Sequence, residues 1–397
     1  MREGEIMTDN PLTWLAPGDI SWPLAGRSTP LPDLLTALTQ TGGGLGESLA
    51  VTGRIAPDDP ESWWEQWRGE AHRNLARAEY ALARNSRTSA SQGYLRAVAQ
   101  GAAAERGLRL LPTDDRRREA AAFIRDAFRR AMPLLAPRTG EVLVPLNGSR
   151  LPGYLLHPKK RGKSPLAWIT LGAGSFAEEG FGLLGQALLD RGFAVLLLDG
   201  PGQGRSLREN GLPLRPDWET VARAVAAHAR HFPGIRRDRI CVLGRGLGGH
   251  LALRAATREE ISAVVCDPPL HGVHSWLAAG LPPDGRPALW SGHPPGSAPA
   301  RHALDWLAET LGADDPAALP AALDAYTLDG QQRAAADALL VTPEEMADQA
   351  RRTADILGPK ARIVPFTHDE GAGPDPLALA PHLFHARVTD TLADLVR

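Results

Sequence analysis

The sequence predicts an α/β protein: a doubly wound, mostly parallel sheet with an N-terminal helical domain and an inserted segment over the strand ends. Three observations predict this fold. Apolar side chains recur every three or four residues over 58–135, which is typical of helices. From Gly140 onward the period changes to two, and short apolar runs then alternate with helical segments, as they do in parallel sheets. Prolines and tryptophans interrupt this alternation over 267–333.

The N-terminal part divides into an arm and a helical domain. Residues 1–57 are rich in Pro, Gly and Thr, so we expect an irregular arm with at most one helix, in which Met7 is a second candidate start. A helical domain is expected over 58–137. Its first helix begins at Asp58-Asp59-Pro60-Glu61, because Asp caps free N–H groups and Pro suits the first turn. Two further helices are expected, over 89–108 and 114–135.

The core is expected over 138–397, with an insertion at about 268–335. It begins with a hairpin, because two alternating runs flank Asn147-Gly148, a dipeptide typical of two-residue turns. Strands and helices then alternate, which predicts ligand binding beyond the carboxyl ends of the strands. The strands are expected at 141–146, 151–157, 166–171, 194–199, 239–243, 263–266, 338–342 and 362–366, and the helices at 178–190, 217–231, 250–256, 344–357 and 381–396.

Composition limits the partners. Charged residues make up 23% of 397 residues and the formal net charge is −2, so neither nucleic acid nor an anionic membrane is an expected partner. No run is apolar for long enough to span a bilayer, and Glu3 and Glu5 lie where a signal peptide would be basic; we therefore expect a cytoplasmic protein. Cys241 and Cys266 are expected as buried apolar residues without a disulfide, and the basic run at 159–163 as a solvated turn.

One stretch organises the core. From Cys241 an apolar strand runs through glycines into a helix, with Gly244-Arg245-Gly246-Leu247-Gly248 at the turn. This pattern matches the nucleophile elbow G-x-S-x-G, in which a serine stands on a sharp turn between a strand and a helix. Here Gly246 occupies the serine position. A glycine cannot form an acyl-enzyme, so serine hydrolase activity is not expected.

Several motifs together resemble the FrsA-like branch of the α/β hydrolases, the group that includes 2,6-dihydroxypseudooxynicotine hydrolase and fungal polyketide-processing enzymes. The resemblance covers about Asp58 to Leu395. It implies a helical cap over a hydrolase core, an active site between the two, and a homodimer. The motifs that carry it are Pro60-Glu61-Ser62-Trp63, Tyr94-Leu95-Arg96-Ala97, Leu151-Pro152-Gly153-Tyr154-Leu155, Glu178-Glu179, Asp199-Gly200-Pro201-Gly202-Gln203-Gly204 and the elbow.

The triad that this resemblance implies is degenerate. Its nucleophile falls on Gly246, its acid on Met346, and its histidine near Asp375 in the segment that begins at Glu370. Nearby residues leave alternatives open. Glu344, Glu345 or Asp348 could replace the acid, and His368 could replace the histidine.

Part of the chemistry survives, because an oxyanion hole is made of backbone N–H groups. Leu247 and Ala173 are expected to supply these two donors. An oxyanion hole without a nucleophile still stabilises an enolate, which requires a base near the strand ends. Asp375 is the first candidate for that base, because it stands at the old histidine position. The candidates for other roles are His271 and His274 as general acids, Glu178 as an orienting residue, and Arg245 and Glu345 as substrate contacts.

Three functions remain open. The first is a non-hydrolytic enzyme that acts on an acylated or polyketide-like small molecule by elimination, C–C cleavage or cyclisation; loss of a carboxylic acid from an acylated tetronate is one concrete form. The second is a hydrolase that uses direct water attack. The third is a binding protein that has lost catalysis. No cofactor or metal is expected, because the histidines lack a short-spaced pair with a carboxylate.

Overall fold

The computed structural model describes residues 21–22, 27–28, 45–279, 281–291, 293–330, 333–373 and 375–396. Most of the arm, including Met7, lies outside these ranges. The described part of the arm contains the strands β1 (Ser21–Trp22) and β2 (Arg27–Ser28) and the helix α2 (Leu45–Thr52). Among the described residues, no helix combines the length and the apolar character needed to cross a bilayer.

Three antiparallel helices follow, and they confirm the helices predicted before residue 137: α3 (Pro60–Ala83), α4 (Arg87–Leu108) and α5 (Arg116–Leu135). The Asp59 side chain accepts hydrogen bonds from the first free N–H groups of α3, as its capping role predicts. We call these three helices the cap. Its inner side joins the core of the sheet, where the Phe128 and Tyr154 rings lie 4.9 Å apart.

The central sheet has eight strands in the order β10-β9-β8-β7-β5-β6-β4-β3, and it confirms the predicted doubly wound, mostly parallel arrangement. In this sheet, as far as the structure describes it, β3 pairs antiparallel with β4 and β4 antiparallel with β6, while the other neighbours are parallel. The order in which the chain adds strands to the sheet reverses between β5 and β7. Ligands bind at such a switch point in doubly wound sheets. The bounds are β3 (Arg138–Leu146), β4 (Ser149–His157), β5 (Ser164–Thr170), β6 (Ala194–Leu198), β7 (Ile235–Arg245), β8 (Ala263–Asp267), β9 (Asp337–Pro343) and β10 (Ala361–Phe366).

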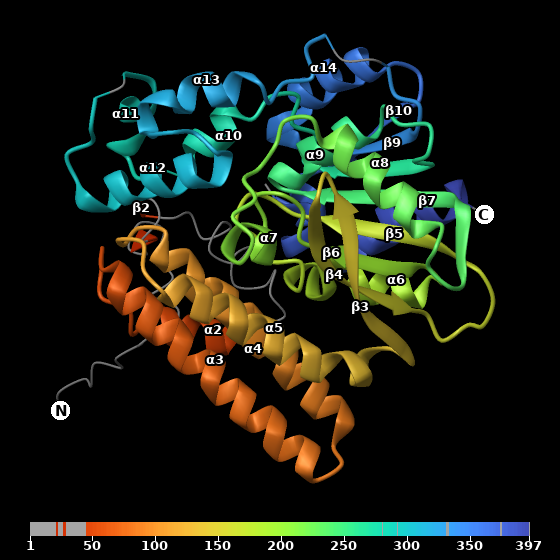
Figure 1. Cartoon of the computed structure of the whole chain (residues 1–397), viewed down its shortest axis with the longest axis horizontal. Coiled ribbons are helices and arrows are strands. Elements are labelled where there is room, and N and C mark those ends of the chain that lie inside the picture. Colours follow the sequence, from red (N-terminus) through yellow and green to blue (C-terminus); the bar gives the residue numbers. More distant parts are fainter. Residues whose placement is uncertain are drawn as a thin grey trace, which may run out of the picture.

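Helices cover both faces of the sheet (Figure 1). Two of the predicted helices differ from the observed ones. The helix expected at 178–190 begins later, with a π turn, and the last predicted helix, 381–396, begins at Pro381 as expected but passes through a π turn over His385–Thr389. The elements are η2 (Phe181–Gly185), α6 (Gln186–Asp190), α7 (Gly204–Arg208), α8 (Trp218–Ala229), α9 (Leu247–Ala255), η4 (Glu344–Met346), α14 (Ala347–Leu357), η5 (His368–Glu370), α15 (Pro376–Leu379), α16 (Pro381–Phe384), η6 (His385–Thr389) and α17 (Asp390–Leu395).

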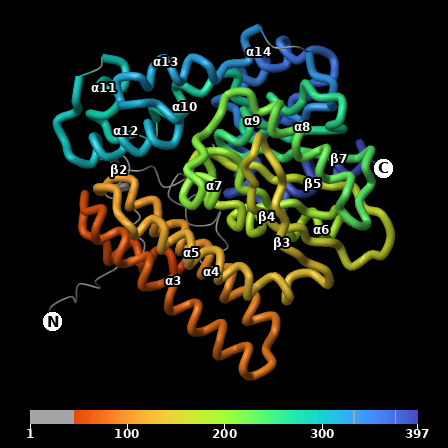
Figure 2. The backbone as a smooth tube through the Cα atoms, viewed as in Figure 1, coloured from red at the N-terminus to blue at the C-terminus, as the bar shows by residue number. Residues whose placement is uncertain are grey.

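The segment between β8 and β9 forms short helices rather than an irregular loop: α10 (His274–Ala279), α11 (Gly285–Ser291), α12 (Ala298–Leu311), η3 (Pro316–Ala318) and α13 (Leu319–Asp324). We call this segment the insertion. Figures 1 and 2 show the insertion and the cap on the same side of the sheet, with the insertion above and the cap below. An ion pair between Arg117 of α5 and Glu309 of α12 joins the two at 3.1 Å.

The predicted environments of the cysteines and of the basic run are confirmed. Cys241 and Cys266 are buried and form no disulfide. Residues 159–163 are exposed between β4 and β5.

The elbow between β7 and α9 is packed backbone against backbone. A Cβ atom at Gly244 would lie 1.9 Å from the carbonyl oxygen of Gly248. A Cβ at Gly248 would lie 2.3 Å from the Thr170 oxygen, and one at Gly249 would lie 2.2 Å from the Pro268 oxygen. None of these contacts can be relieved by turning a side chain. Glycine at these positions is therefore a requirement of the fold.

We expect Gly248→Ala to destabilise the protein by about 3 kcal/mol or more, because the new methyl group overlaps the backbone of β5. Gly140→Ala is the matched control, since a Cβ at Gly140 has no neighbour within 4 Å. Its effect should stay within about 0.5 kcal/mol. Urea unfolding of the two variants tests this, and equal stability would contradict the packing described above.

Candidate active site

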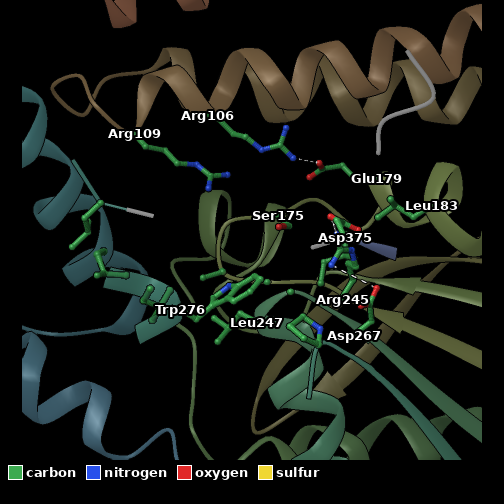
Figure 3. A pocket seen from close by; sticks show the side chains of 18 of the residues that line it. Arg106, Arg109, Ser175, Glu179, Leu183, Arg245, Leu247, Asp267, Trp276 and Asp375 are labelled. Atoms are coloured by element: carbon green, nitrogen blue, oxygen red, sulfur yellow. Dashed lines mark hydrogen bonds and ion pairs between the residues drawn. The ribbon is translucent and has the colours of Figure 1, made fainter. Parts of the chain in front are cut away.

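A cavity of about 540 Å³ lies beyond the carboxyl ends of β5, β7, β8 and β9. Arg106 from α4, Arg109 directly after α4 and Trp276 from the insertion line it (Figure 3). Trp306 of the insertion also lines it. The loops after the strands supply the floor, which includes Gly246. Apolar side chains make up much of the remaining lining: Leu110, Leu171, Leu183, Leu247, Leu277, Leu281, Ala303, Leu307 and Met346.

The turn at Gly246 has the backbone conformation of a nucleophile elbow. Its φ of 61° and ψ of −129° lie in a region that L residues rarely adopt. A Cβ at this position would meet only Cζ2 of Trp276, at 3.8 Å, among the described residues. The cavity therefore has room for a side chain at the elbow, and the glycine there is not explained by crowding.

The residues of the two predicted oxyanion donors both lie at this floor. Ala173 and Leu247 both line the cavity, and a Cβ on the adjacent Gly172 would lie 3.6 Å from the Leu247 nitrogen. Neither the Ala173 nor the Leu247 N–H donates to an acceptor among the described residues. Both N–H groups can therefore bind a substrate oxygen.

Ser175 carries the one hydroxyl group among the described residues that line the cavity. It lies on the loop after β5, and no hydrogen bond joins its Oγ to a histidine or carboxylate among the described residues. The arrangement that activates a serine nucleophile is therefore not formed around it.

An ion cluster replaces the triad next to the elbow. The Arg245 guanidinium donates a hydrogen bond to Asp375, and its Nη1 lies 3.6 Å from Oδ2 of Asp267 (Figure 3). Asp375 also accepts a hydrogen bond from the Ala378 N–H at 3.1 Å, which caps α15. Burial raises the pKa of Asp267 to about 7; the negative charge of Asp375 adds to the rise, and Arg245 opposes it. Asp267 can therefore hold or release a proton near neutral pH.

The opposite wall is cationic. Arg106 donates to Glu179 of the loop after β5, and Arg109 donates to the buried Glu105 at 2.9 Å. Arg109 also donates to the carbonyl oxygen of Gly174 at 3.0 Å. Arg109 is therefore fixed beside the oxyanion loop.

The predicted site residues divide into those that line the cavity and those that lie elsewhere. Gly246, Leu247, Ala173, Asp375, Arg245 and Glu345 line it together. His368 does not line it, but its Nε2 lies 2.7 Å from Oε1 of Glu345. His271 and His274 face a separate hollow beside α10, where His274 pairs with Asp324 at 3.0 Å.

Glu178 lies beneath the oxyanion loop and does not line the cavity. It is buried and accepts a hydrogen bond from the Tyr154 hydroxyl at 2.7 Å. Burial, with the nearby Asp199, raises the pKa of Glu178 to about 7. This placement suits an orienting group, as the sequence predicts, rather than one that contacts a ligand.

The sequence analysis missed Asp267, Arg106 and Arg109. Asp267 directly follows the apolar run of β8, and that position at a strand end could have identified it. The two arginines stand three residues apart near the end of α4, so they share one face of the helix. Nothing in the sequence shows that this face meets the cavity.

In the part of the chain that the structure describes, no group of three or more His, Cys, Asp or Glu side chains is arranged to hold a metal ion. The cluster around Arg245 holds two carboxyl groups, and both face the guanidinium.

Residues 151–395 match the alpha/beta hydrolase family. Among curated proteins, Hydrolase LUC6 of a Fusarium species is 39% identical over 247 residues, which are 60% of this chain and 59% of that protein. The 20-hydroxy-prefusarin hydrolase FUS2 of Gibberella moniliformis is 38% identical, with the same coverage of each chain. The hydrolyase poxO of Penicillium oxalicum is 32% identical over 62% of this chain and 60% of its own length. The match thus spans about three fifths of these relatives.

Among solved structures, the 2,6-dihydroxy-pseudo-oxynicotine hydrolase superposes with a TM-score of 0.70 at 22% identity, covering 91% of this chain and 95% of its own. The structure of AbyA5 superposes with a TM-score of 0.56 at 17% identity, covering 87% and 93%. Both superpositions include elements outside the sheet as well as the sheet itself, because each covers most of this chain.

The raised pKa of Asp267 makes stability depend on pH. The folded chain holds this proton more tightly than the unfolded chain, so the stabilising contribution is complete below about pH 4 and is lost as the pH rises through about 7. Asp267→Asn keeps the side chain neutral throughout. We expect the unfolding free energy of the variant to rise relative to wild type between these pH values, by at most about 1.4 kcal/mol per pH unit.

Urea unfolding at a series of pH values measures this difference. Asp238→Asn is the control, because the Asp238 side chain is 66% exposed and should show no such trend. If the difference in unfolding free energy between Asp267→Asn and wild type does not change with pH, Asp267 is ionised over the whole pH range measured.

Proposed function

This chain belongs to the alpha/beta hydrolase family, and we propose that it is a non-hydrolytic enzyme that removes a proton beside a carbonyl group and then eliminates a carboxylate. The substrate is an acylated, polyketide-like small molecule; an acylated tetronate is one concrete form.

One observation carries this proposal: two unoccupied oxyanion donors adjoin a pair of carboxyl groups at an elbow without a nucleophilic side chain. The Ala173 and Leu247 N–H groups supply the donors, and Asp267 and Asp375 supply the pair. A carbonyl oxygen held by both N–H groups becomes more negative when the neighbouring carbon loses a proton, so the donors stabilise the enolate. The carboxylate pair is the base within reach of that carbon.

The steps balance without a co-reactant. The carboxylate pair takes the proton as the C–H bond breaks, and the electron pair moves to the carbonyl oxygen. When the enolate collapses, a C=C bond forms and the C–O bond to the acyloxy group breaks. The carboxylate leaves with that electron pair, and the proton passes from the pair to water. Asp375 is the member placed at the substrate, because its side chain is more open than that of Asp267.

The relatives support enzymatic activity on small molecules, since they are named hydrolases and hydrolyases of fungi and one is named for 20-hydroxy-prefusarin. The apolar lining of the cavity suits a polyketide-like skeleton. The homodimer and the cytoplasmic location stay predictions of the sequence analysis.

A second candidate is hydrolysis by direct attack of water. It is favoured by the close approach of His368 Nε2 to Oε1 of Glu345, at 2.7 Å; the two residues follow the last two strands, where the family's histidine and acid are expected. In this mechanism His368 takes a proton from water at the cavity rim. Its Nε2 faces Glu345, and the imidazole is 55% exposed, so this pair is less shielded from solvent than the pair beside Arg245.

To test the main proposal, the protein is incubated with a small-molecule extract of its source organism in water labelled with the heavy oxygen isotope. We expect it to release a carboxylic acid that contains no label. Elimination breaks the alkyl C–O bond, whereas hydrolysis at the acyl carbon places label in the acid. Asp375→Asn should lower the rate by about 100-fold or more, because it removes the base. Mass spectrometry measures both products. Labelled acid would contradict elimination, and a retained but unconverted metabolite would support a binding protein.

His368→Gln separates the two mechanisms. Under the main proposal it leaves the rate within about threefold, because His368 does not reach the reacting atoms; under direct water attack it lowers the rate by about 100-fold. The rate of product formation by mass spectrometry decides between them. Asp369→Asn is the matched control, since Asp369 is the exposed neighbour of His368 in η5 and does not line the cavity.

A further inference from the structure

The wall of the cavity opposite the elbow contains a buried cluster with more positive than negative groups. Its ion pairs join three guanidinium groups, of Arg109, Arg117 and Arg208, to the carboxylates of Glu105 and Glu309. The two arginines behind the wall, Arg117 and Arg208, have side chains only 3% exposed. Among the described residues, these three guanidinium groups and two carboxylates therefore give the cluster one more positive charge than negative charges.

Glu105 and Glu309 differ in how strongly they attract the arginines of this cluster. Glu105 is fully buried, and the three cations around it hold its pKa at about 2 against the opposing effect of burial. Glu309 is 43% exposed, so water weakens its attraction for Arg117 and Arg208. A buried cation that lacks a partner is destabilising unless an anion joins it. The cluster is therefore an incomplete site for an anion.

Arg109 is the arginine of this cluster that lines the cavity. Its Nε and Nη2 bind Glu105 at 3.0 and 2.9 Å, and Nη2 also binds the Gly174 oxygen. Nη1 donates to no described residue. The guanidinium lies over the Trp306 ring, 4.6 Å from its centroid, and Figure 3 shows it pointing from α4 into the cavity. These contacts hold the group still while one N–H face stays open.

We propose that Arg109 binds an anionic oxygen group of the substrate, a carboxylate or the ionised enol of a β-dicarbonyl compound. This inference rests on the proposed function, because it concerns the substrate of the same cavity. The anion lies beside Gly174, and so next to the Ala173 N–H. The remainder of the substrate extends across the cavity, and its acidic C–H bond reaches the carboxyl pair at Arg245. Arg106, three residues before Arg109, lies on the same wall, and its pair with Glu179 carries no net charge, so the excess charge is at Arg109.

Two pairs of probes test the charge preference by isothermal calorimetry. Phenylbutyrate is compared with phenylbutyramide, and an acyl tetronic acid is compared with its O-methyl ether. Within each pair the apolar part is nearly the same and only one member is an anion, so the two arms separate a carboxylate from an enolate. We expect the wild-type protein to bind at least one anion about tenfold tighter than its neutral counterpart, which is the gain of about one charge-assisted hydrogen bond.

Three variants assign this preference to Arg109. Arg109→Gln should bind the anion and its neutral counterpart equally, and Arg109→Lys should retain part of the preference because it keeps the charge. Arg129→Gln is the control: Arg129 is half exposed on the cap, pairs with Glu141 and lies outside the cavity, so the variant loses the same charge with no effect on the preference. Thermal unfolding confirms that each variant is folded.

Equal binding of anion and neutral probe by the wild type, a preference that persists in Arg109→Gln, or no binding of any probe would each overturn the proposal. Failure of the proposed function gives a different result, because binding requires no turnover. Asp375→Asn should retain the anion preference even where it abolishes product formation.

Discussion

The close packing of backbone at the elbow is the constraint on which the site depends. Gly244 and Gly248 approach each other within the turn, and Gly248 and Gly249 lie against the ends of β5 and β8. This contact places the start of α9 against the loop after β5, so that Leu247 and Ala173 line the same cavity. None of this geometry uses a side chain at Gly246. The proposed oxyanion hole therefore does not depend on the residue at the elbow, because its donors belong to the backbone.

The two walls of the cavity have opposite electrostatic character. On the elbow side, two carboxyl groups face the single guanidinium of Arg245, so this side can hold or release a proton. On the cap side, three guanidinium groups face two carboxylates, and Arg109 carries the excess charge to the surface of the cavity. An anionic substrate is oriented by such a field before any chemistry takes place. In the proposed reaction, both walls together then determine where the C–H bond lies relative to the base.

Three distant parts of the chain make this arrangement. Arg109 comes from the cap, Trp306 from the insertion and Arg245 from the sheet. The cap and the insertion are held to each other by Arg117 and Glu309, behind the wall that they share. The ion pairs of this cluster therefore both hold the cap to the insertion and set the charge of the cavity wall. A scaffold shared with hydrolases can change its chemistry through such side chains while the backbone donors stay in place.

The sequence by itself determined the order of strands and helices, because periodicity and turn residues are local properties. It also determined the elbow, since the glycines of Gly244-Arg245-Gly246-Leu247-Gly248 mark the turn by their spacing. Asp375 could be placed in the cavity from its position after the last strand. Only the tertiary structure decided that Arg245 bridges Asp267 and Asp375, and that His271 and His274 face away. It also decided which face of α4 meets the cavity. These facts depend on side chains from separate segments, 130 residues apart for Arg245 and Asp375, and no local pattern encodes which of them will meet.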